Sequence, residues 1–151
     1  MILRSFLSTV GVGLLLAGCS NGPVAHLPGE DLSVQVKWGS EAWIVTVRNS
    51  AGSASGELGW ASDKRRANIY LTPSRQLVVI EQGGFVACFA VPNNGPPAAL
   101  TGGMCDEHSD RWRYVGVIEG KEFRTDVPEC IPLLGEGSSP FRRAYQRESF
   151  C

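Results

Sequence analysis

The chain has 151 residues, of which 14 are basic and 15 acidic, with 43% hydrophobic and 19% charged residues. This length and composition fit one globular domain and argue against a disordered chain, and a formal net charge of -1 argues against general nucleic-acid binding. The 18 glycines and 9 prolines interrupt the sequence too often for long helices.

The first 18 residues predict a signal peptide. Arg4 is followed by an apolar run from Phe6 to Ala17, which at about 1.5 Å per residue is too short to cross the ~30 Å hydrocarbon core of a membrane. The run ends in Leu16-Ala17-Gly18-Cys19, which resembles the lipobox of bacterial lipoproteins. The resemblance implies cleavage before Cys19, lipid on its thiol and amine, and a periplasmic protein anchored in a membrane. Ser20 at the next position is similar to the sorting signal for the outer membrane.

Residues 19–31 are predicted to form the lipidated cysteine and a flexible tether. The segment after Cys19 is polar, contains two Pro and two Gly, and shows no apolar period. His26 lies inside it and is expected to be solvated.

From Leu32 onward the sequence predicts short strands separated by turns. Leu32, Val34, Val36 and Trp38 alternate with polar residues, and Trp43, Val45 and Val47 follow the same period. The further strands are expected at 69–71, 77–80, 85–91, 112–118 and 123–125, with turns at Thr72–Arg75 and Gly83-Gly84 and loops at 49–56 and 93–103. Ser139-Pro140 predicts the start of a short C-terminal helix. Residues 32–151 are therefore expected to form an all-β domain, a small antiparallel sandwich or barrel with one short C-terminal helix.

Cys88, Cys105, Cys130 and Cys151 remain once Cys19 is assigned to the anchor. An even number of cysteines in an oxidising compartment predicts two disulfides, and four cysteines allow three pairings. We favour Cys88–Cys105 and Cys130–Cys151, because each pair closes a Gly- and Pro-rich loop of about 20 residues. No CxxC or Cys/His spacing indicates a metal site.

The sequence does not predict a catalytic centre or a cofactor site. Gly52-Ser53-Ala54-Ser55-Gly56 has Ala54 where a nucleophile elbow requires serine, so a flexible loop is the favoured interpretation. His108 lies next to Asp106 and Glu107. We favour a solvated acidic loop there over a cation site or a partner contact.

Arginine-rich segments are the main candidates for a partner surface. Arg is favoured at protein interfaces because its planar guanidinium makes paired hydrogen bonds and stacks on aromatic rings. Arg111 and Arg113 alternate with Trp112 and Tyr114, and both arginines would point outward if the aromatic residues face the core. The candidate partner-binding residues are Arg111, Arg113, Arg142 and Arg143, together with the acidic Asp106 and Glu107.

These features favour a non-enzymatic periplasmic protein-binding module. In size and architecture the expected domain resembles the immunity lipoproteins that neutralise type VI secretion effectors, and this resemblance implies a toxic protein as partner. The alternative is a structural or assembly lipoprotein of an envelope or secretion complex. A small hydrolase is disfavoured because no set of nucleophile, base or metal ligands is recognisable.

Overall fold

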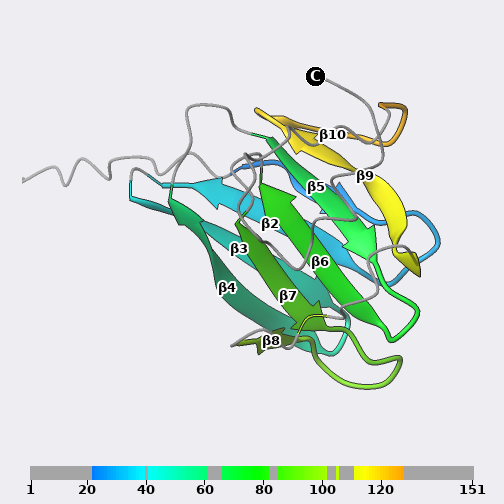
Figure 1. Ribbon diagram of the computed structural model, residues 1–151. Coiled ribbons are helices and arrows are strands. Elements are labelled where there is room, and N and C mark those ends of the chain that lie inside the picture. Colours follow the sequence, from blue (N-terminus) through cyan, green and yellow to red (C-terminus); the bar gives the residue numbers. More distant parts are fainter. Residues whose placement is uncertain are drawn as a thin grey trace, which may run out of the picture.

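A computed structural model describes residues 22–39, 41–60, 66–81, 85–101, 105 and 111–127. Across these described residues, ten strands form two antiparallel sheets that pack face to face (Figure 1). The four-stranded sheet has the order β1-β2-β3-β4 and contains β1 (Val24–His26), β2 (Ser33–Trp38), β3 (Ala42–Asn49) and β4 (Gly52–Trp60). The six-stranded sheet has the order β10-β9-β5-β6-β7-β8 and contains β5 (Arg66–Leu71), β6 (Gln76–Glu81), β7 (Val86–Ala90), β8 (Ala98–Leu100), β9 (Arg113–Glu119) and β10 (Glu122–Arg124). The predicted all-β sandwich is confirmed, whereas the predicted C-terminal helix lies outside the described residues.

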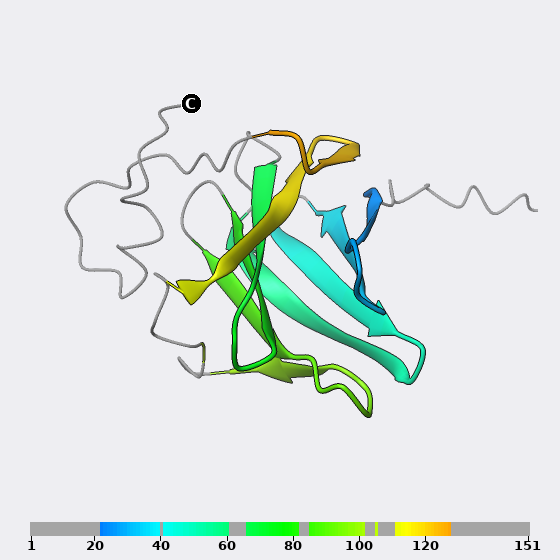
Figure 2. The same ribbon diagram turned by 90° about the vertical axis from the view of Figure 1, so that its right-hand side faces the viewer.

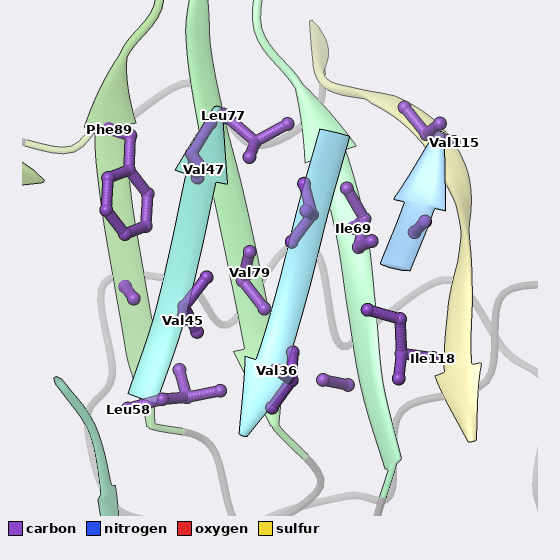
Figure 3. Close-up of a cluster of buried hydrophobic side chains, with 14 of the residues drawn as sticks. Val36, Val45, Val47, Leu58, Ile69, Leu77, Val79, Phe89, Val115 and Ile118 are labelled. Carbon is purple, nitrogen blue, oxygen red and sulfur yellow. The ribbon is translucent and has the colours of Figure 1, made fainter. Parts of the chain in front are cut away.

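The core lies between the two sheets (Figure 3). Its side chains come from the alternating positions of β2 and β3 that the sequence predicts, such as Val36 and Val45, and from Ile69, Val79 and Phe89 of the six-stranded sheet. Trp38 and Trp43 pack edge to face, with ring centroids 4.3 Å apart. The Trp38 indole N–H also donates to the Gly120 carbonyl at 2.8 Å. This bond connects the end of β2 to the turn between β9 and β10, and so connects the two sheets.

The six-stranded sheet is buried on both faces in its centre. Tyr70, Val78, Ile80, Cys88 and Trp112 form a second apolar cluster on the face turned away from the main core. This explains why β6 and β7 read as continuous apolar runs. The strand predicted at 85–91 is observed at Val86–Ala90, inside the sheet between β6 and the edge strand β8.

Three segments depart from the sequence prediction. Residues 52–56, predicted as part of a flexible loop, belong to strand β4 and pair with β3. Residues 98–100, predicted as loop, form the short strand β8. Residues 24–26, predicted as tether, form strand β1 and pair with β2. The described part of the predicted tether therefore belongs to the folded domain, because Ala25 and Leu27 are buried in the core.

The predicted turn at Thr72–Arg75 is confirmed. Arg75 N–H donates to the Thr72 carbonyl at 3.1 Å, and the Thr72 hydroxyl accepts from Gln76 N–H at 3.0 Å. Arg75 itself adopts a left-handed conformation with φ of 58°. This is the geometry of a turn followed by one left-handed residue, a common connection between antiparallel strands.

Candidate functional site

The outer face of the four-stranded sheet is accessible and mainly polar, with Val24 and Ile44 as exposed apolar side chains, in contrast to the apolar outer face of the six-stranded sheet. Figure 2 shows the two sheets as separate layers, with the four-stranded sheet on the right. We call the solvent-facing side of this sheet the open face. Its side chains are all exposed or half-buried and comprise Val24, His26, Ser33, Gln35, Lys37, Ile44, Thr46, Arg48, Ser53, Ser55 and Glu57.

Strand register places these side chains in rows across the sheet. His26 of β1 lies opposite Ser33 of β2, and Ser33 lies opposite Arg48 of β3. Arg48 in turn lies opposite Ser53 of β4. Directly opposite residues on one face of an antiparallel pair have neighbouring side chains. The register therefore brings an imidazole, a guanidinium and two hydroxyls into one line.

A pocket of about 230 Å³ lies at the β1 end of this row. His26, Ser33 and Arg48 of the strands line it, and the turn between β1 and β2 contributes Glu30 and Asp31. Leu32 and Asn49 complete the lining. The pocket is thus built from three strands and one turn.

Glu30 is held by two arginines of the other sheet. Arg75 Nη1 lies 2.8 Å from Glu30 Oε2, and Arg113 Nη2 lies 3.1 Å from Glu30 Oε1. The side chain of Glu30 is only 19% exposed, so these charge-assisted bonds are partly shielded from water. Both carboxylate oxygens of Glu30 are therefore engaged.

Asp31 is also engaged, by the turn between β3 and β4. One carboxylate oxygen accepts hydrogen bonds from the hydroxyl of Ser50 and, at 3.1 Å, from its N–H. The Ser50 hydroxyl makes the larger contribution to lowering the pKa of Asp31 below its usual value, and the Ser50 N–H adds to it. Ser50 therefore favours the ionised form of Asp31.

Asn49 stabilises the same turn between β3 and β4 through hydrogen bonds of its side chain. Its side-chain oxygen accepts from the N–H groups of Ala51 and Gly52, both at 3.0 Å. Its amide nitrogen donates to the Gly95 carbonyl at 2.9 Å, in the connection between β7 and β8. These bonds connect Asn49, which lines the pocket, both to the turn between β3 and β4 and to the connection between β7 and β8 of the other sheet.

Among the described residues, the pocket groups that remain available to a ligand are His26, Ser33, Arg48 and the second carboxylate oxygen of Asp31. Within the described ranges, Arg48 makes no ion pair or side-chain hydrogen bond, although it lines the pocket. A positively charged fork beside an imidazole and a hydroxyl can bind an anion. Among the described residues no cluster of three or more His, Cys, Asp or Glu could hold a metal ion.

The structure places only some of the residues predicted from the sequence. Cys88 and Cys105 form a disulfide with 5.8 Å between their Cα atoms, as predicted. Arg111 is exposed next to the start of β9, and Arg113 is exposed and bonded to Glu30. The remaining predicted residues lie outside the described residues: Cys19, Asp106, Glu107, His108, Cys130, Arg142, Arg143 and Cys151.

Trp112 and Tyr114 do not face the main core. Both pack against Tyr70 on the outer face of the six-stranded sheet, with ring centroids 5.9 and 5.7 Å away. Arg113 lies between them in the strand and therefore points to the opposite face, where it reaches Glu30. The condition on which both arginines are expected to point outward, aromatic residues facing the core, is therefore not met for the main core, and Arg113 remains 54% exposed while it contacts Glu30.

Sequence reasoning missed the pocket because its residues were assigned to other segments. The sequence prediction assigns His26, Glu30 and Asp31 to the tether and Asn49 to a loop. For the open face, the available signal is the alternation in β4, where Ser53, Ser55 and Glu57 are exposed and Leu58, in the bulge, is buried. Ala54 and Gly56 at the inward positions carry too little apolar surface to make that alternation visible.

Comparison of this chain with protein-family models, curated proteins and solved structures finds no match. In the part of the chain that the structure describes, no helix has the length and apolar character needed to span a membrane.

Proposed function

We propose that this protein is a lipid-anchored, non-enzymatic protein-binding module of the bacterial periplasm, and that the open face is its partner surface. The proposal depends on one observation: the open face is a broad, accessible polar surface on a rigid two-layer scaffold. Its hydroxyl, amide and charged groups offer many donors and acceptors, as the polar part of a protein interface requires. The membrane-anchored, periplasmic location is inferred from the resemblance of residues 16–19 to a lipobox.

The pocket supports binding better than catalysis. A hydrolase that uses two carboxylates needs one of them free to give or take a proton near the substrate. Glu30 is bonded to Arg75 and Arg113, and Asp31 is bonded to Ser50. Because both oxygens of Glu30 are engaged, the pocket lacks a second carboxylate free to work with Asp31.

A toxic secreted protein is the partner class that we favour. The support is the resemblance in size and expected architecture to immunity lipoproteins, together with a surface suited to a folded protein. A role as an assembly lipoprotein of the envelope is the alternative outcome of the same experiment.

The test is capture of partners from membranes by the tagged full chain after mild cross-linking. Ser53 is exposed on the open face, whereas Thr125 is exposed just beyond β10. Ser53→Arg should abolish capture of the partner by placing a bulky charge in the interface, and Thr125→Arg, which makes the same change in size and charge, should leave it intact. A single stoichiometric secreted enzyme supports an immunity role, and a stable envelope complex supports assembly. If no protein depends on Ser53, the open face is not the partner surface.

Anchoring is tested separately. Cys19→Ser should abolish incorporation of palmitate and release the protein into the soluble periplasmic fraction. Unchanged labelling of this variant would contradict lipidation at Cys19.

A further inference from the structure

We infer that the free edge of strand β4 pairs with the same edge of a second copy of this chain, so that two four-stranded sheets join into one continuous sheet. The inference does not depend on the proposed function, because it rests on the main chain of β4 and not on what the open face binds. Recognition of this kind uses main-chain hydrogen bonds between two extended strands.

Strand β4 differs in length from the other edge strands of the two sheets (Figure 1). The sheets end in β1, β4, β8 and β10. As the structure describes them, β1, β8 and β10 have 3 residues each, whereas β4 has 9. Short edge strands, proline and lysine are means by which proteins keep a sheet edge from pairing with another chain. Because β4 is long and contains neither proline nor lysine, it is the least protected edge in the described part of the chain.

Alternate residues of β4 turn their main-chain N–H and C=O groups away from β3. Asn49 pairs directly with Gly52 across a two-residue turn, so these two residues exchange hydrogen bonds. Because only every second pair of an antiparallel ladder exchanges them, Ser53, Ser55 and Glu57 direct their main-chain groups to the free edge. In the ranges that the structure describes, no hydrogen bond joins these groups to another element. They are therefore available to an incoming strand.

The edge of β4 is also accessible. Ala54 and Gly56 face the core but are only half-buried. Their partners in β3, Val47 and Val45, are completely buried. The exposure therefore comes from the side of β4 that faces away from β3, which is the side that a further strand would occupy.

The sequence of this edge is complementary to itself. With a two-fold axis at Ser55, that residue lies opposite its own copy and Ser53 lies opposite Glu57 of the second copy. Each of these pairs would exchange two main-chain hydrogen bonds, and a serine hydroxyl would face each carboxylate. An axis at Glu57 would instead place two carboxylates directly opposite each other, which is unfavourable. On the core-facing side Ala54 would lie opposite Gly56, so two small residues meet. A second copy is therefore the occupant that the sequence of β4 favours.

The first experiment is a disulfide cross-link in the full chain, oxidised in bacterial membranes. Ser55→Cys places two thiols across the two-fold axis, in a pair whose Cα atoms would lie about 5.5 Å apart, within reach of a disulfide. Ser53→Cys is the matched control, because it makes the same change at another exposed position of β4, where the two copies would lie more than about 12 Å apart.

Ser55→Cys should run as a dimer on a non-reducing gel. Ser53→Cys should stay at the background level that the unsubstituted chain, with its own cysteines, shows under the same treatment. Equal cross-linking of the two variants, or none with Ser55→Cys, would overturn the inference.

The second experiment separates the main chain of residue 55 from its side chain. Ser55→Ala removes the hydroxyl and keeps the N–H, whereas Ser55→Pro also removes the N–H that points to the free edge. Proline is tolerated there because this N–H is not used within the sheet, and an unfolding curve of each variant checks that it is folded. Sedimentation equilibrium of the full chain in density-matched nonionic detergent should show a dimer for Ser55→Ala. Ser55→Pro should weaken self-association by about tenfold or more, and equal dimerisation of the two variants would overturn the inference.

These outcomes are separable from those of the proposed function. A two-fold axis perpendicular to the sheet keeps both open faces on the same side, where a partner can still reach them. A dimer that captures no partner would retain the edge pairing and remove the binding module. A monomeric chain that loses its captured partner with Ser55→Pro, but not with Ser55→Ala, would overturn the second copy and assign the edge of β4 to a strand of the partner.

Discussion

Arg75 Nη1 lies 2.8 Å from Glu30 Oε2, which joins a turn of the six-stranded sheet to a turn of the four-stranded sheet. Arg113 bonds the other oxygen of the same carboxylate at 3.1 Å. Arg75 also donates from Nε to the Val91 carbonyl at 3.3 Å. One side chain thus connects three segments that are distant in sequence, and it does so from a backbone conformation that is unfavourable for arginine.

The first prediction separates the ion pair of Arg75 with Glu30 from its left-handed backbone conformation. Arg75→Ala should lower the free energy of unfolding by about 1–2 kcal/mol, because it removes the partly shielded ion pair but keeps a Cβ in the left-handed region. Arg75→Gly also loses the pair but relieves the backbone strain, so it should be more stable than Arg75→Ala by about 1 kcal/mol. Urea denaturation of both variants measures the difference. An alanine variant as stable as the glycine variant would show that the left-handed conformation is not strained.

The second prediction concerns Cys88 and Cys105. Their disulfide closes a loop with a sequence separation of 17 residues, and a loop of that size is expected to contribute about 3 kcal/mol by restricting the unfolded chain. Cys88→Ala, Cys105→Ala and the double variant should therefore lose similar amounts of stability, since each breaks the same bond. Chemical denaturation under non-reducing conditions measures all three. Losses that add in the double variant would indicate that the two cysteines are not partners.

The third prediction concerns the bulge in β4. The register between β3 and β4 shifts between Ala42 and Ile44, and Gly59 adopts φ of +62° at this point. A Cβ at Gly59 would overlap the Cβ and ring atoms of Phe85. Gly59→Ala should therefore cost about 1 kcal/mol for the backbone conformation and a further 1–3 kcal/mol, roughly, for the clash.

Gly120 provides the control for this clash. It has φ of +59°, but no heavy atom lies within 4 Å of the position that a Cβ would take. Gly120→Ala should show the backbone cost alone. Adding Phe85→Ala to Gly59→Ala should recover the part of the stability loss that comes from the clash, as measured by a double-mutant cycle. Equal losses for Gly59→Ala and Gly120→Ala would contradict the contact with Phe85.

The strands that could be predicted from the sequence are those whose buried positions carry large side chains. Val34, Val36 and Trp38 recur at every second residue and predict β2, and the same period predicts β3. In β4 the inward position 56 is a glycine that leaves room for a neighbouring side chain, because a Cβ there would lie 3.1 Å from the ring of Phe89. A small residue at such a contact removes the apolar signal on which the prediction depends.

The candidate site could not be predicted because it depends on pairing between distant segments. Glu30 precedes Arg75 by 45 residues and Arg113 by 83. That His26, Ser33 and Arg48 lie side by side follows only from the register of strands β1, β2 and β3. Local periodicity reports which residues are buried, but it does not report which exposed residues become neighbours.

The last prediction concerns the pH dependence of Asp31. The hydroxyl and N–H of Ser50 lower the pKa of Asp31 in the folded protein, so the folded-state pKa lies below the unfolded-state pKa. The stabilising contribution of this carboxylate is therefore fully present above the unfolded-state pKa and is lost as the pH falls through the folded-state pKa. Ser50→Ala removes the hydroxyl hydrogen bond, which makes the larger contribution to the shift, and should raise the pKa of Asp31 toward its usual value. Asp126 provides an internal control, because Arg124 lowers its pKa independently of Ser50. NMR titration of the side-chain carboxyl carbons should show a shift at Asp31 and none at Asp126, and an unchanged titration of Asp31 would show that the Ser50 hydroxyl does not hold this carboxylate in solution.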